Sequence, residues 1–168
     1  MKNWQFFLTR CLESIERQTF EDYEVILIKH STMPVTSNRV IESAKGELIK
    51  VLYMDDYFTE PSVLQRIVDN FDSSDNWMIM GSNDNLIPYW TDDIETGNNK
   101  LGSPSALVMR NKDLFDERLS WLLDCDLFKR MYGLYGKPKI IQGDNITIGK
   151  HDGQMSNILT EQEKQEEF

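Results

Sequence analysis

The segment from Ala44 to Phe58 places the strongest constraint on the fold of this chain. Residues 48–54 form an apolar run of strand length that leads directly into two adjacent carboxylates, Asp55 and Asp56. Carboxylates at the carboxyl end of a buried strand lie where an α/β sheet opens into its ligand crevice. Oxygen ligands of this kind suit Mg²⁺ or Mn²⁺, which bridge carboxylates to phosphate oxygens. The alternative is an ordinary turn, in which Asp is also a common residue.

The composition is that of one globular domain. The chain has 168 residues, 40% of them hydrophobic, which is enough to bury a core. No stretch reaches the length of a membrane span and no signal-peptide pattern opens the chain, so we expect a cytoplasmic protein. Its two cysteines, Cys11 and Cys125, are too few for a disulfide framework or a thiolate zinc site. The net charge of -10 argues against nucleic acid as a partner, because such binding needs cationic contacts with phosphate.

Hydrophobic periodicity predicts alternating helices and strands. Residues 81–105 are rich in Asn, Asp, Gly and Pro, which indicates a long functional loop. We expect one domain over residues 1–158 and a charged, flexible tail over 159–168. Apolar spacing predicts helices over 7–15, 37–45, 63–71 and 124–135, and strands over 24–28, 48–54, 77–80, 106–109 and 139–141.

Five phrases follow one another along the chain. They are LTRCLESIERQTF (8–20), EVILI (24–28), AKGELI (44–49), DLFDE through DCDL (113–127) and HDGQMS (151–156). In this order and at these spacings they resemble the family 2 inverting glycosyltransferases, over nearly the whole chain. Each phrase alone is a weak signal, but five in sequence are strong evidence.

The resemblance implies a fold and a reaction. The fold would be a GT-A nucleotide-sugar-binding domain of the α/β class, with a mixed, mostly parallel central sheet flanked by helices. The family's first strand is missing, because only residues 1–4 precede the first helix. The reaction would move a sugar from a nucleotide-diphosphate donor, a UDP-sugar by default, to the hydroxyl of an unknown acceptor. That acceptor would be a glycan, a lipid or a protein.

The resemblance also assigns a metal site. Asp55 matches the last carboxylate of the family's "DxD" motif, which would bind Mn²⁺ or Mg²⁺, with Asp56 as a second ligand or supporting group. Tyr53 replaces the first Asp of the motif, so Tyr53 and Met54 are expected to border the donor without a carboxylate. His151 would add an imidazole ligand or a hydrogen bond to the diphosphate. The alternative for His151 is a loop histidine that is hydrogen-bonded to backbone.

On the acceptor side, Asp124 matches the aspartate that serves as the family's base. Inversion requires such a group to remove the proton of the attacking hydroxyl. The alternative is that Asp124 caps the helix that follows it. Asp126 is a supporting residue in this interpretation. Trp90 and Trp121 are acceptor-side candidates, because aromatic rings stack on sugars, although either ring can equally pack on the core.

The donor side departs most from the family pattern. Lys29 and His30 stand where the family has an acidic pair that contacts base and ribose, and neither accepts hydrogen bonds as carboxylates do. Asn38 is the retained half of the family's "RN" element. Gly102 and Ser103 lie where the family's chain passes close to the donor sugar, and a small residue allows that approach. These departures leave an alternative function, a non-catalytic relative that binds a nucleotide, a sugar or a protein partner.

The missing strand leads to a prediction about assembly. A sheet that lacks an edge strand exposes unpaired backbone, which a second copy of the chain can cover. We therefore expect a homodimer. A solution mass measurement tests this, and a strictly monomeric particle would contradict it.

Overall fold

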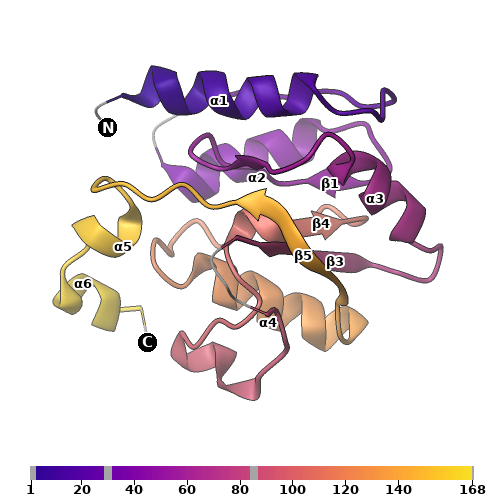
Figure 1. The fold of residues 1–168 in the computed structure, drawn as a ribbon. Helices are drawn as coiled ribbons and strands as arrows, with labels where there is room; N and C mark the ends of the chain where they lie inside the picture. The colour runs from indigo at the N-terminus through magenta and orange to yellow at the C-terminus, as the bar shows by residue number, and fades with distance from the viewer. Residues whose placement is uncertain (1–2, 29–31, 84–86, 168) are drawn as a thin grey trace.

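The structure is a computed structural model that describes residues 3–28, 32–83 and 87–167. It is a mixed α/β fold built around a five-stranded sheet (Figure 1). The strand order is β1-β4-β3-β5-β2. The elements in chain order are α1 (Trp4–Glu16), α2 (Met33–Ser43), β1 (Ile49–Lys50), β2 (Tyr57–Phe58), α3 (Val63–Asn70), β3 (Trp77–Ser82), the 3-10 helices η1 (Asp92–Thr96) and η2 (Pro104–Ala106), β4 (Leu107–Met109), α4 (Leu123–Tyr135), β5 (Lys139–Thr147), α5 (Met155–Ile158) and α6 (Glu161–Gln165).

Strand β3 is the centre of the sheet and is buried along its whole length. Because successive side chains of a strand point to opposite faces, its residues divide between two hydrophobic clusters. Trp77 and Ile79 pack with Phe128 of α4 and Ile41 of α2. Met78 and Met80 belong to the other cluster, which contains the apolar face of α3. Helix α1 lies on one side of the sheet and α4 on the other (Figure 1).

The sheet corrects one expectation. Three of the four strand pairs in the described part of the chain run antiparallel, and the pair β3–β5 runs parallel. The sheet is therefore mixed rather than mostly parallel. The long β5 lies between two neighbours: it pairs in parallel with β3 from Lys139 to Ile146, across an irregularity, and antiparallel with β2 at Ile146 and Thr147.

The prediction of a strand over residues 24–28 was also wrong. No strand is assigned there, and Val25 and Leu27 are 50% and 62% exposed. The segment is held instead by Glu24, whose carboxylate accepts hydrogen bonds from the backbone N–H groups of Lys45 and Gly46. Hydrophobic sequence alone does not make a strand, because a strand also needs a neighbour for its backbone groups.

The helices expected at 7–15, 63–71 and 124–135 are confirmed by α1, α3 and α4, and the helix expected at 37–45 begins earlier, at Met33. The strands expected at 77–80 and 106–109 are confirmed by β3 and β4. The apolar run 48–54 forms only the two-residue strand β1 before it turns. Within the described residues, no helix is long and apolar enough to cross a membrane.

The C-terminal segment has more regular structure than the sequence predicts. Residues 161–165 form α6, which begins with a capping box between Thr160 and Glu163. Beyond it, the carboxylate of Glu167 accepts hydrogen bonds of 2.7–2.8 Å from the backbone N–H groups of Ser120, Trp121 and Leu122. These N–H groups precede α4, so the segment is attached to the start of that helix.

Gly81 provides a test of the central strand pair. A Cβ atom on Gly81 would lie 2.4 Å from the carbonyl oxygen of Gly143 in β5, and backbone cannot swing away as a side chain does. We expect Gly81→Ala to lower the free energy of unfolding by about 2–3 kcal/mol. Gly133→Ala is the matched control, because a Cβ there meets nothing within 4 Å and α4 gains about 0.5–1 kcal/mol of helix propensity. Chemical denaturation of both variants measures the difference, and equal stabilities would contradict this account.

Candidate functional site

The metal-side residues converge from two distant segments. Asp55 lies in the turn between β1 and β2, and His151 follows β5. Their side chains meet at 3.0 Å, between Asp55 Oδ2 and His151 Nε2. His151 Nδ1 accepts a hydrogen bond from the Gly153 backbone, so the neutral ring carries its proton on Nε2 and donates it to Asp55. The loop histidine is thus bonded to backbone and also faces the expected metal ligand.

Asp56 occupies a different place from Asp55. Its side chain is buried, and its carboxylate accepts a hydrogen bond of 2.9 Å from the Gly149 backbone. Burial raises the pKa of Asp56 to about 6, and the charge of Asp55 adds to the effect. Asp56 therefore joins the turn to the segment after β5, whereas Asp55 directs its carboxylate to His151.

The Asp55–His151 pair fits part of a divalent-metal site. The 3.0 Å between Oδ2 and Nε2 is a hydrogen bond, so Asp55 is available as a ligand, whereas His151 binds a metal ion through Nε2 only after that nitrogen loses its proton. Among the described residues, no cluster of three or more His, Cys, Asp or Glu side chains is suited to a metal ion. The protein thus offers a partial ligand set, which suits Mg²⁺ or Mn²⁺ because such ions take substrate phosphates and water as further ligands.

Arg10 was missed by the sequence reasoning. From α1, its Nη2 donates a hydrogen bond of 2.6 Å to the carbonyl oxygen of Asp55. Its guanidinium also lies 4.3 Å from the ring centre of Tyr57, and Phe7 on the same helix packs against the His151 ring at 4.9 Å. Helix α1 therefore supports both members of the Asp55–His151 pair. The available signal was the i,i+3 spacing of Phe7 and Arg10 on one helix face.

Asp124 lies in the first turn of α4 but does not cap it. The N-cap residue is Leu122, without a side-chain cap bond. The Asp124 carboxylate is bound on both oxygens, by the Cys125 backbone N–H at 2.9 Å and by the side-chain amide of Asn99 at 2.8 Å. Burial raises the pKa of Asp124, and these two donors oppose the rise. A carboxylate with a raised pKa is a stronger base, which suits removal of a hydroxyl proton.

Tyr53 links the metal side to Asp124. Burial raises the pKa of the Tyr53 hydroxyl, and the charges of Asp124, Asp56 and Asp55 contribute to the same rise. The residue therefore lies within electrostatic range of all three carboxylates. Its hydroxyl is 3.1 Å from that of Ser37, and its backbone N–H donates to the Ser105 hydroxyl. The aromatic replacement in the metal motif is therefore affected by the charges of all three acids.

Lys50 is a second residue that the sequence reasoning missed. Its ammonium group donates to the backbone carbonyl oxygens of Val51, Ser105 and Leu107. Burial lowers its pKa to about 7, against the opposing effect of the Asp56 charge. A lysine inside an apolar strand was the signal available in the sequence.

The other residues predicted on the donor side have different surroundings in the structure. Asn38 is buried and braces another part of the chain, because its amide bonds to the backbone of Phe115 and to Glu117. Ser103 accepts a hydrogen bond from Ser105 as the cap of η2, and Gly102 bonds to Asn99. Met54 lies half-buried in the turn beside Asp55. Lys29 and His30 lie outside the described residues.

The acceptor-side aromatics pack against the protein. Trp90 stacks on Tyr132 of α4 with ring centres 3.8 Å apart and planes within 4°. Trp121 is half-buried, with the ammonium of Lys164 4.8 Å from its ring centre. Asp126 pairs with Arg130 one turn along α4, which gives it a structural task.

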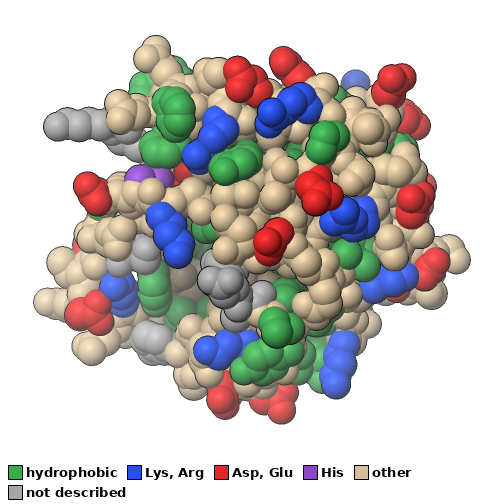
Figure 2. Space-filling model, viewed as in Figure 1, with side chains coloured by type: hydrophobic (Ala, Val, Ile, Leu, Met, Phe, Trp, Pro, Cys, Tyr) green, Lys and Arg blue, Asp and Glu red, His purple; other side chains and the backbone are tan. Residues whose placement is uncertain are grey.

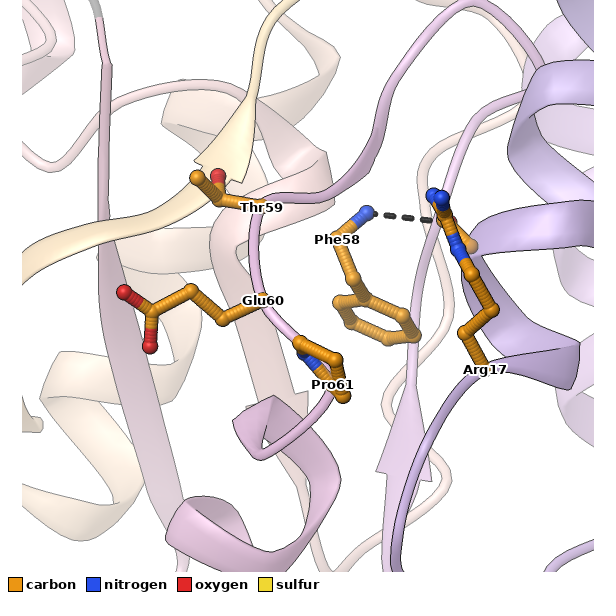
Figure 3. A pocket seen from close by; sticks show the side chains of 6 residues that line it. Arg17, Phe58, Thr59, Glu60 and Pro61 are labelled. Carbon is orange, nitrogen blue, oxygen red and sulfur yellow. Dashed lines mark hydrogen bonds between the residues drawn. The ribbon is translucent and has the colours of Figure 1, made fainter.

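A small hollow lies between the C-terminal end of α1 and the segment that follows β2. Ser14, Arg17, Phe58, Thr59, Glu60 and Pro61 line a volume of about 110 Å³ (Figure 3). A pocket for a drug-sized ligand takes roughly 300–1,000 Å³, so this hollow is too small for a nucleotide-sugar. On the surface, lysine, arginine and carboxylate side chains are interspersed over the face in Figure 2.

Comparison with solved structures identifies the fold. The chain is similar to TarS 1-349 of S. aureus in complex with UDP-GlcNAc, with a TM-score of 0.69 and 16% identity over 94% of this chain. The TarS structure in complex with UDP gives a TM-score of 0.60 and 16% identity over 89% of this chain. These alignments span 59% and 58% of the TarS chains. The chain therefore has a GT-A-like glycosyltransferase fold. No family model and no curated protein matches the sequence.

The attachment of Glu167 gives a prediction for the start of α4. The Glu167 carboxylate accepts three backbone hydrogen bonds at a helix N-terminus, where negative charge is favourable. We expect Glu167→Gln to lower the free energy of unfolding by about 1 kcal/mol, because the charge and part of the acceptor capacity are lost. Glu166→Gln, an exposed neighbour, is the control. Thermal or urea unfolding measures both, and identical curves would show that the attachment does not contribute to stability.

Proposed function

We propose that this chain is a metal-dependent inverting glycosyltransferase that uses a nucleotide-diphosphate sugar. The proposal is supported by the hydrogen-bonded Asp55–His151 pair and by the buried Asp124 carboxylate, with both aspartates acting electrostatically on Tyr53, in a GT-A-like fold. A structural scaffold alone does not require both a paired carboxylate and imidazole and a buried carboxylate with a raised pKa. The solved neighbours hold UDP-GlcNAc or UDP, which supports a UDP-sugar as donor.

Each residue has a distinct task in the proposed reaction. Asp55 would hold Mn²⁺ or Mg²⁺, which would supply Lewis-acid stabilisation of the charge that develops on the diphosphate, and His151 would donate its Nε2 proton to the diphosphate or, after losing it, become a second ligand. Asp124 accepts the proton of the acceptor hydroxyl as that oxygen bonds to the anomeric carbon. The bond between the anomeric carbon and the diphosphate oxygen breaks in the same displacement, and the configuration inverts. Asp56 and Arg10 keep the turn that carries Asp55 in place.

A non-catalytic nucleotide- or sugar-binding role is the second candidate. One observation favours it: Asp55 already bonds to His151, and no third metal-binding side chain joins them among the residues that the structure covers. A binding protein of this kind would retain affinity for the nucleotide without turnover. The two functions therefore differ in one measurable product, the free nucleotide.

Release of nucleotide from a panel of nucleotide-sugars, with Mn²⁺, Mg²⁺ or a chelator, tests the proposal. We expect metal-dependent release of UDP by the native protein and its loss in Asp55→Ala. Asp124→Asn is expected to lower kcat by about 100-fold or more, because general-base catalysis contributes at least that factor. Asp22→Asn, which changes an exposed carboxylate far along the chain from these residues, is the control.

Binding measurements complete the test. Thermal shifts with UDP and metal, recorded without an acceptor, show whether the nucleotide binds at all. Binding without turnover of any donor would support the non-catalytic role. Neither binding nor turnover with any metal would contradict both. Full activity in Asp124→Asn would remove Asp124 as the base.

A further inference from the structure

Asn99 makes hydrogen bonds with every polar position of its side-chain amide. Its Oδ1 accepts from the backbone N–H groups of Leu101 at 2.8 Å and Gly102 at 3.2 Å. Its Nδ2 donates to the Gly102 carbonyl oxygen and to Asp124 Oδ2, both at 2.8 Å. A primary amide has two donor hydrogens and two acceptor positions, so Asn99 is fully used. Replacement by any other side chain loses at least part of this set.

These contacts join two parts of the proposed site. The bonds to Leu101 and Gly102 close a tight turn in which Gly102 has φ 101°, a conformation that favours glycine. The turn leads directly to Ser103, which caps η2. The fourth bond crosses to α4 and reaches Asp124, 25 positions along the chain. The turn proposed to face the donor sugar and the carboxylate proposed as base are thus bound to one side chain.

The Asp124 carboxylate is fixed in orientation by this arrangement. Its Oδ1 accepts from the backbone N–H of Cys125 at 2.9 Å and its Oδ2 from Asn99. Rotation of the carboxylate breaks at least one of these bonds. A general base must hold one lone pair toward the proton that it removes, and misplacement of such a group is costly to the rate.

We propose that Asn99 is the positioning residue for Asp124, and that it sets the base and the 99–103 turn as one unit. This inference rests on the proposed function, since it concerns the same site. Asn99 acts through Asp124, and it need not touch the substrate.

The surroundings of Asp124 define the expected pH effect. Among the described residues, Tyr53 from the segment after β1 and Cys125 on its own helix interact electrostatically with Asp124. Glu95 of η1, which packs on α4, is paired with Lys129. The Asn99 donor favours the charged carboxylate and lowers the pKa of Asp124, against the rise caused by burial. Loss of that donor therefore raises the pKa further.

Two substitutions at Asn99 separate its tasks. Asn99→Ala removes all four bonds. Asn99→Asp keeps acceptors for the Leu101 and Gly102 N–H groups, but it loses the donor to the Gly102 carbonyl oxygen and places a carboxylate against Asp124. Asn98→Ala and Asn98→Asp are matched controls, because Asn98 is the exposed neighbour on the same loop. Solvent screens a charge added there.

The first measurement is the pH dependence of kcat. The base acts only when ionised, so activity falls as pH drops below its pKa. We expect the acidic limb of the profile to move to higher pH in both Asn99 variants, by about one unit or more in Asn99→Asp, where two carboxylates repel each other. Asn99→Ala should also raise KM for the donor more than Asn99→Asp does, because it loses all three bonds to the turn, whereas Asn99→Asp loses only the bond to the Gly102 carbonyl oxygen. If the acidic limb of the Asn99 variants lies at the same pH as that of the Asn98 controls, the proposal is overturned.

The second measurement does not depend on turnover. Titration of ¹³C-labelled aspartate carboxyl groups by NMR, without substrate, reports the ionisation of Asp124, whose signal is assigned by its loss in Asp124→Asn. We expect this titration to move upward in both Asn99 variants and to stay in place in both Asn98 variants. A protein that turns over no donor but shows these shifts would contradict the proposed function and support the inference. Unchanged titration in a folded Asn99→Asp would overturn the inference, whatever the activity.

Discussion

The burial of β3 on both faces is the constraint on which the rest of the structure depends. Strand β3 pairs with β4 on one side and β5 on the other, and its alternating side chains enter both hydrophobic clusters. Helix α4, which carries Asp124, packs on it through Phe128. Strand β5, which leads to His151, approaches it so closely at Gly81 that no side chain fits between them. The positions of both halves of the site are therefore set by one strand.

The site is assembled from bonds that cross long distances in sequence. Gly149 donates to the Asp56 carboxylate, and this contact brings the end of β5 to the turn after β1. His151 bonds to the Asp55 side chain, and Arg10 of α1 donates a hydrogen bond to the Asp55 carbonyl oxygen. Burial disfavours the charge on Asp56 and raises its pKa to about 6. The two acids of one Asp-Asp pair thus have different partners: Asp56 bonds to the Gly149 backbone and Asp55 to the His151 side chain.

Local signals in the sequence were a reliable guide to the helices. The apolar spacing in α3 and α4 is a property of each helix by itself, which is why both were expected within a residue or so of their observed ends. The sheet was harder, because a strand exists only with its neighbour. Residues 24–28 have the composition of a strand but no partner in the described sheet, and the parallel direction expected for most strands holds for β3–β5 alone among the described pairs. Glu167, within a segment expected to be a flexible tail, bonds to the start of α4, which no local pattern indicates.

The sequence by itself determined the alternating helices and strands and the candidates Asp55, His151 and Asp124, because each rests on a local pattern or on a phrase with a fixed spacing. Only the tertiary structure decided which candidates meet. In the folded chain, Asp56 bonds to Gly149 and Asn38 bonds to Phe115. Asn99 bonds to Asp124 and Arg10 bonds to Asp55, although no sequence motif indicated either contact. The physical reason is that hydrogen bonds between distant segments depend on how the helices and the sheet pack. No pattern within one segment contains that packing.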